Sequence, residues 1–243
     1  MKQKVSVPFM LLGILFNVCL IAANLLETKV IQVFGITVTA GLLVFPISYI
    51  INDCIAEGWG FRKARLIIWS GFAMNFFVVM LGLIAVALPA APFWDGAAHF
   101  NFVFGMAPRI VIASLTAFLV GSFLNAYVMS RMKLASNGRN FSARAIWSTV
   151  VGETADSLIF FPVAFGGIIA WRELLVMMCG VGWRMLCMAG VAGVEVFQIL
   201  LKSMYEVLIL PVTIRVVKAI KRIDGSDVYD EGISYKVWKI GDI

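Results

Sequence analysis

The stretch that decides the fold runs from Arg144 to Arg172 and reads RAIWSTVVGETADSLIFFPVAFGGIIAWR. Of the 27 residues between these arginines, only Glu153 and Asp156 are charged. As a helix that rises about 1.5 Å per residue, the segment is long enough to cross a hydrocarbon core of about 30 Å. The segment therefore predicts a membrane span that carries two carboxylates near mid-depth.

A charge at the centre of a bilayer costs about 2.5 kcal/mol or more by insertion scales. Glu153 and Asp156 are one helical turn apart, so they share a face of the predicted helix. The default interpretation of such a pair is a binding or relay site that faces protein or water. Phe160 follows on the same helix and can stack on a flat ligand, although an aromatic side chain in a span is also an ordinary core or lipid-facing residue.

The composition places the whole chain in a membrane. The 243 residues are 61% hydrophobic, and the mean hydropathy of +0.95 is outside the range of soluble domains. The net charge of +6 comes from short basic clusters between apolar runs, which indicate topology rather than nucleic-acid binding. One histidine and four cysteines without CxxC spacing give no basis for a metal site, and we expect no cofactor.

Six apolar runs are each long enough for a transmembrane helix. The last of them is interrupted only by Lys202 and Glu206. The runs cover residues 5–26, 30–52, 66–94, 110–130, 145–171 and 196–214. The sequence therefore predicts an all-α integral membrane protein with six spans, the first of which is retained rather than cleaved as a signal peptide.

The distribution of basic residues predicts that both termini are cytoplasmic, because short cytoplasmic loops collect Lys and Arg. With the N-terminus inside, fifteen basic residues lie on the cytoplasmic side and four on the other. A seventh span through 174–194 would move the basic tail outside. We therefore expect a re-entrant or interfacial hairpin near 172–194. Residues 1–222 form the transmembrane domain in this interpretation, and 223–243 form a short polar cytoplasmic tail.

Polar residues in the other spans are further candidates for a site. Lys202 and Glu206 are four residues apart and form either a structural ion pair or part of a binding site near Pro211. Asp53 and Glu57 have the same spacing, and Glu57 is open to a surface salt bridge with the basic cluster that follows it. The remaining buried amides, including Asn75 and Asn125, are typical of hydrogen bonds that hold helices together.

Several motifs resemble the queuosine precursor transporter family, also called the vitamin uptake transporter family. The resemblance covers most of residues 20–215 in order, although 171–195 is longer than expected for the family, and no role is assigned there. The motifs are Phe45-Pro46 followed by Asp53, Gly60 and a basic cluster; Ala98-His99-Phe100-Asn101 with Arg109-Ile110; Asp156-Ser157-Leu158-Ile159-Phe160-Phe161; and the span from Lys202 to Pro211.

This resemblance implies a multi-pass importer in the cell inner membrane, with no nucleic acid as a partner. The implied substrates are 7-cyano-7-deazaguanine and 7-aminomethyl-7-deazaguanine, precursors of the tRNA base queuosine. A guanine-like edge offers adjacent N–H donors to a carboxylate and a carbonyl oxygen to a donor. The predicted substrate-binding residues are Asn24, Asp53, Glu153, Asp156, Phe160, Lys202, Tyr205 and Glu206.

The alternative function is the substrate-binding subunit of a vitamin importer that a separate ATPase module energises. The chain itself has no Walker A motif. An enzyme is not expected, because no Gly-x-Gly-Asp stretch of an intramembrane aspartyl protease occurs in a span. Association of the chain with further copies of itself stays open.

Overall fold

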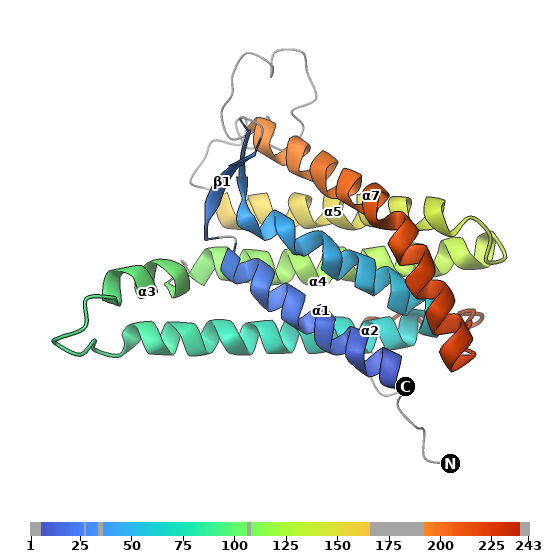
Figure 1. Ribbon diagram of the computed structural model, residues 1–243, viewed down its shortest axis with the longest axis horizontal. Coiled ribbons are helices and arrows are strands. Elements are labelled where there is room, and N and C mark those ends of the chain that lie inside the picture. Colours follow the sequence, from blue (N-terminus) through green and yellow to red (C-terminus); the bar gives the residue numbers. More distant parts are fainter. Residues whose placement is uncertain (1–5, 27, 34–35, 106–107, 166–191, 239–243) are drawn as a thin grey trace.

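The computed structural model describes residues 6–26, 28–33, 36–105, 108–165 and 192–238. Long helices dominate these residues and pack side by side (Figure 1). In chain order the helices are α1 (Val7–Leu26), α2 (Phe45–Ala87), α3 (Ala97–Phe104), α4 (Pro108–Ala135), α5 (Phe141–Phe165) and α7 (Ala192–Asp224). Each of the six predicted apolar runs overlaps a long helix, and 174–194 lies outside the described residues apart from its last three positions.

Helix α2 is a hairpin of two helices rather than one continuous rod. Gly60 interrupts it with φ 79° and ψ 174°, a conformation that glycine adopts at no steric cost. In Figure 1 the chain runs from the β-strands to one end of the bundle and returns from there. The second half of α2 therefore begins at Phe61, and the Gly60 turn separates two of the predicted spans.

A short antiparallel β-hairpin replaces the first part of the predicted run 30–52. Strand β1 (Val30–Val33) pairs with β2 (Ile36–Thr39), and a 3-10 turn (Ala40–Leu43) leads into α2. Valine, isoleucine and threonine fill most of these positions, and β-branched side chains favour a pleated strand. The helical part of this segment is therefore shorter than the apolar run, because hydropathy alone does not distinguish strand from helix.

The distribution of side chains is that of a membrane protein. Charged groups such as Glu57, Arg144 and Glu153 are at most 1% exposed, whereas Leu11 and Phe77 on the outer surface are 57% exposed. Polar groups inside and apolar groups outside suit a lipid environment. Within the described residues, three segments are long and apolar enough to cross a membrane: Val7–Leu26, Phe45–Ala87 and Ile112–Ala135.

Several turns gather at one end of the bundle, which we call the Gly60 end (Figure 1). It consists of the Gly60 turn, the turn 136–140 between α4 and α5, the end of α7, and the segment 225–238, which we call the C-terminal strap. The strap folds back onto the helices: Arg65 donates to the Lys236 carbonyl at 2.7 Å, and Trp69 to the Val237 carbonyl at 3.0 Å. The β-hairpin and α3 lie toward the other end.

Candidate functional site

Polar side chains from three helices meet between the first half of α2, α4 and α5. The Ser148 hydroxyl on α5 donates to Asp53 on α2, with Oγ 3.2 Å from Oδ1 and 3.4 Å from Oδ2, and both side chains are fully buried. Asn52 donates through Nδ2 to Asn125 Oδ1 on α4 at 2.7 Å. We call this group the three-helix cluster; it also includes Tyr49, Thr149, Glu153 and Asp156.

Two glycines allow the three helices to approach closely. A Cβ atom at Gly152 on α5 would lie 3.0 Å from the Gly121 carbonyl oxygen on α4 and 2.9 Å from the Tyr49 ring. A Cβ atom at Gly121 would lie 2.8 Å from the Tyr49 hydroxyl and 3.2 Å from the Asp156 Cβ. Any larger residue would push the helices apart. The glycines thus bring Tyr49 against both neighbouring helices, beside Asp156.

Three of the predicted carboxylates therefore lie in the same region. Asp53, Glu153 and Asp156 are all close enough to the Tyr49 hydroxyl to act on it electrostatically. Asp53 and Glu153 are both 0% exposed. Phe160 is half-buried one turn after Asp156 on α5, where a ring can lie beside that carboxylate.

The other predicted site residues lie elsewhere or outside the description. Asn24 donates to Asn75 at 2.8 Å and accepts from Ser114 at 3.4 Å, so it joins α1, α2 and α4 in a separate polar contact. Tyr205 is half-buried against an apolar cluster that contains Ile50. Lys202 and Glu206 belong to α7, but their side chains are outside the described part of the chain.

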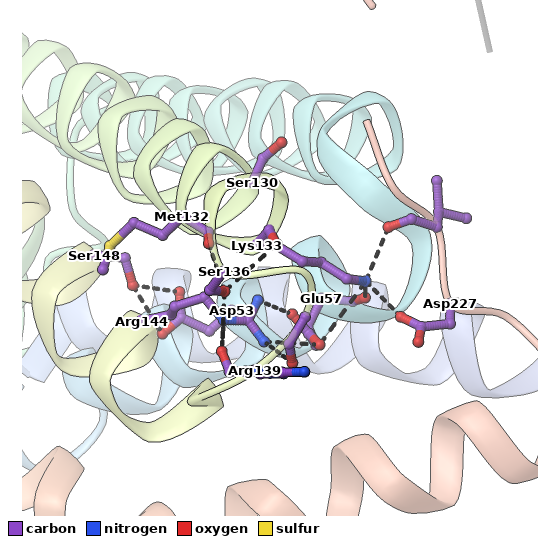
Figure 2. Close-up of polar contacts among 12 residues, drawn as sticks. Asp53, Glu57, Ser130, Met132, Lys133, Ser136, Arg139, Arg144, Ser148 and Asp227 are labelled. Carbon is purple, nitrogen blue, oxygen red and sulfur yellow. Dashed lines mark hydrogen bonds and ion pairs between the residues drawn. The ribbon is translucent and has the colours of Figure 1, made fainter. Parts of the chain in front are cut away.

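A network of charges around the buried Glu57 lies one helical turn from Asp53 of the three-helix cluster (Figure 2). Glu57 on α2 accepts two hydrogen bonds from Arg144 on α5, at 2.5 and 3.2 Å. It accepts a third from Lys221 on α7 at 2.8 Å. Lys133 on α4 lies 3.8 Å from the same carboxylate and donates to the Glu57 backbone carbonyl at 2.6 Å. Glu57 thus ties together the ends of four helices.

These partners correct one expectation from the sequence. Glu57 is 1% exposed, so it does not form a surface salt bridge, and its partners Arg144, Lys133 and Lys221 are distant in sequence. The local basic cluster after Gly60 suggested a nearby solvated partner. Glu57 is buried instead, and a carboxylate removed from water needs several donors around it, which here come from other helices.

The C-terminal strap completes the charge network. Asp227 accepts from Lys133 at 2.6 Å and lies 2.9 Å from the Lys221 Nζ. Partial burial favours the neutral acid, but the hydrogen bonds from Lys133 and Lys221 outweigh it and hold the pKa of Asp227 below its ordinary value. Asp230 accepts from the Phe61 backbone N–H at 2.8 Å and from Ser130 at 2.5 Å.

The sequence of the chain is similar to those of known proteins. A model of a family described as a putative vitamin uptake transporter matches residues 39–216, which contain the three-helix cluster and most of the charge network. The chain belongs to the vitamin uptake transporter family. The resemblance to queuosine precursor transporters that the motifs indicated is confirmed. No solved structure matches the chain.

Curated relatives of this family member carry transporter names. A probable queuosine precursor transporter of Bacillus subtilis (strain 168) is 32% identical over 156 residues, which cover 61% of this chain and 65% of the relative. The queuosine precursor transporter of Escherichia coli (strain K12) is 28% identical over 163 residues, 65% of this chain and 67% of the relative. A probable queuosine precursor transporter of Haemophilus influenzae is 30% identical over 136 residues, 54% of each chain. The match thus spans about two thirds of the first relative's length.

Sequence reasoning missed several members of the three-helix cluster in this family member. Tyr49, Asn52 and Asp53 follow one another at helical spacing on α2, and Ser148, Thr149, Gly152, Glu153 and Asp156 do so on α5. This recurrence at three and four residues was a signal for a polar helix face. Asn125 gave no such signal, because its role depends on a helix that is distant in sequence. Within the described residues, no group of His, Cys, Asp and Glu is arranged to hold a metal ion.

Proposed function

We propose that this vitamin uptake transporter imports queuosine precursors across the cell inner membrane, with 7-cyano-7-deazaguanine and 7-aminomethyl-7-deazaguanine as substrates. The observation that carries the proposal is the three-helix cluster, which holds Asp53, Glu153 and Asp156 together inside an apolar bundle. Intramembrane carboxylates are costly and mark substrate or ion pathways. The names of the curated relatives supply the substrate class.

The carboxylates suit the polar edge of a deazaguanine. A carboxylate accepts the N–H groups of the exocyclic amino group of such a ring, and a further carboxylate can balance the cation of the aminomethyl form. Phe160 is placed one turn from Asp156 to stack on the ring. Lys202, Tyr205 and Glu206 on α7 remain proposed contacts, while Asn24 is not part of this proposal because its partners lie outside the cluster.

Entry of a substrate requires a movement of helices, because all cluster side chains except the half-buried Asp156 are inaccessible. We assign this movement to the contact of α4 with α5 at Gly121 and Gly152. The two backbones approach closely there, because a Cβ atom at Gly152 would lie 3.0 Å from the Gly121 carbonyl oxygen, and neither glycine has a side chain that interlocks with the opposite helix. Substrate entry and closure would then occur at the same contact that brings Tyr49 and Asp156 together.

The proposed topology has six spans, with both termini in the cytoplasm. Its support is the Gly60 end, which collects Arg65, Lys133, Arg139, Arg144 and Lys221 at one end of the bundle. An excess of Lys and Arg marks the cytoplasmic side. A reporter attached after residue 243 that is active only outside the cytoplasm would contradict this topology and favour a further span through 174–194.

The function is tested in a cell that lacks its own precursor synthesis and its own importer. With the parent chain, queuosine is expected in tRNA when either precursor is supplied. Glu153→Gln and Asp156→Asn should abolish most of this queuosine while the protein still inserts and purifies as a folded species. The matched control is Glu231→Gln, an isosteric change at an exposed carboxylate of the strap. If the parent yields no queuosine, or if both cluster variants import normally, the proposal fails.

A further inference from the structure

Four buried polar atoms in the three-helix cluster have no hydrogen-bond partner among the described residues. They are the Tyr49 hydroxyl, Asn52 Oδ1, Asn125 Nδ2 and Thr149 Oγ1. Their side chains are at most 3% exposed. Buried polar atoms are normally paired, so unpaired ones on adjacent helices call for a partner that the described residues do not supply. Ordered water and a ligand can both fill this place.

The orientation of the two amides is fixed by the backbone. Asn52 faces the Ser122 carbonyl oxygen at 3.1 Å, and a carbonyl only accepts, so the facing atom must be Nδ2. Nδ2 also faces Asn125 at 2.7 Å, so the atom there must be the acceptor Oδ1. Asn52 is therefore left with an open acceptor and Asn125 with an open donor. The two open groups belong to side chains that are hydrogen-bonded to each other.

An open acceptor on one amide and an open donor on the amide hydrogen-bonded to it are complementary to a cyclic lactam, in which an N–H lies next to a C=O. We infer that the Asn52–Asn125 pair reads the lactam edge of a fused heterocycle, with Asn52 accepting its N–H and Asn125 donating to its carbonyl oxygen. This inference rests on the proposed function and assigns to this pair the discrimination between 6-oxo and 6-amino rings. An amidine edge presents the opposite polarity, an acceptor to Asn52 and a donor to Asn125, and is rejected.

The neighbouring groups fit this assignment. Tyr49 packs against Gly152 next to the Asn125 Cβ, because a Cβ atom at Gly152 would lie 2.9 Å from each of them. Its hydroxyl can therefore join the same ligand. The carboxylates of the cluster are then available to accept hydrogen bonds from the amino group beside the lactam N–H. The amide pair thus selects the ring edge, while the carboxylates supply the acceptors that the amides lack.

The test compares two ligands that differ only at the lactam: 7-cyano-7-deazaguanine and its 2,6-diamino counterpart, in which an amidine replaces the lactam. Dissociation constants are measured on purified protein. The parent should prefer the lactam by about 100-fold or more, because a site built around one hydrogen-bond polarity rejects the other. Asn125→Asp keeps the acceptor that faces Asn52 but replaces the open donor by an acceptor. The preference should then narrow by about tenfold or more.

The matched control is Asn17→Asp, which places the same new carboxylate in α1, where Asn17 contacts Gly13 and Ser70. It should keep the parent's preference. If Asn125→Asp does not fold, Asn125→Ser replaces it and should narrow the preference as well. A folded variant at position 125 with the parent's preference overturns the inference and assigns the open atoms to water. A parent that binds neither ligand overturns the proposed function itself.

Discussion

Removal of the Asp230 carboxylate should destabilise the protein, because this side chain caps a helix from a distance. The Phe61 N–H is the first backbone N–H in the second half of α2. The first N–H groups of a helix have no carbonyl acceptor within that helix. Asp230, which is 5% exposed, accepts this N–H at 2.8 Å and the Ser130 hydroxyl at 2.5 Å. Its negative charge also lies at the positive end of a helix dipole.

The magnitude follows from what Asp230→Ala leaves unpaired. The charge-assisted bond to the buried Phe61 N–H contributes about 1.5–3 kcal/mol. Ser130 loses less, because it retains Tyr235 at 3.0 Å. We therefore expect a loss of about 2–3 kcal/mol in the free energy of unfolding. Asp230→Asn keeps a carbonyl acceptor and loses only the charge, so it should cost about 1 kcal/mol.

The measurement is equilibrium unfolding of purified protein in mixed micelles of a mild and a denaturing detergent. Glu231→Ala is the control, because it removes an adjacent but exposed carboxylate and should stay within about 0.5 kcal/mol of the parent. The expected order of stability is parent and control, then Asp230→Asn, then Asp230→Ala. An Asp230→Ala protein as stable as the control would refute the capping argument.

Four further outcomes are expected. Gly60→Ala should lower stability and loosen the strap, measured by proteolysis, because its Cβ would lie 2.6 Å from Asp230 Oδ1 in a backbone conformation with φ 79°. Gly152→Ala should reduce precursor uptake more than it reduces stability, whereas an equal loss of both would contradict a role in substrate entry. The stability difference between parent and Asp227→Asn should be constant from neutral pH down to about pH 4, the unfolded pKa of an aspartate, and be lost as pH falls further through the lowered folded pKa of Asp227. Lys202→Met combined with Glu206→Gln should fold but lose thermal stabilisation by 7-cyano-7-deazaguanine; a double variant stabilised like the parent would make this pair purely structural.

The helices were predictable because their apolar runs are long enough to override other signals. The β-hairpin at 30–39 was not, since β-branched residues raise hydropathy whether they form a strand or a span. The tight turn at Gly60 was also not predictable, because a glycine between two spans is compatible with many turn conformations. The turn also involves Asp230, a residue far away in sequence, which accepts from the Phe61 N–H.

The candidate site shows the same limit. Glu153 and Asp156 stood out because charge is rare in a span, and the structure places them near Asp53. Asn52 and Asn125 did not stand out, because a buried amide in a membrane helix is ordinary and its meaning depends on which atom remains unpaired. That information appears only when two helices are brought together. Asp230 in the predicted polar tail likewise did not stand out, because its partners Phe61 and Ser130 belong to other helices.

The C-terminal strap has a consequence for how the protein is made. The ribosome synthesises Glu57, Lys133 and Arg144 well before residue 227, so the helices enter the membrane while two acceptors of Lys133, on Asp227 and Val228, do not yet exist. The start of the second half of α2 also remains uncapped until Asp230 emerges. The Gly60 end is therefore completed only after the helices have entered the membrane. A chain that stops before the strap leaves the Lys133 ammonium and the Phe61 N–H without these acceptors.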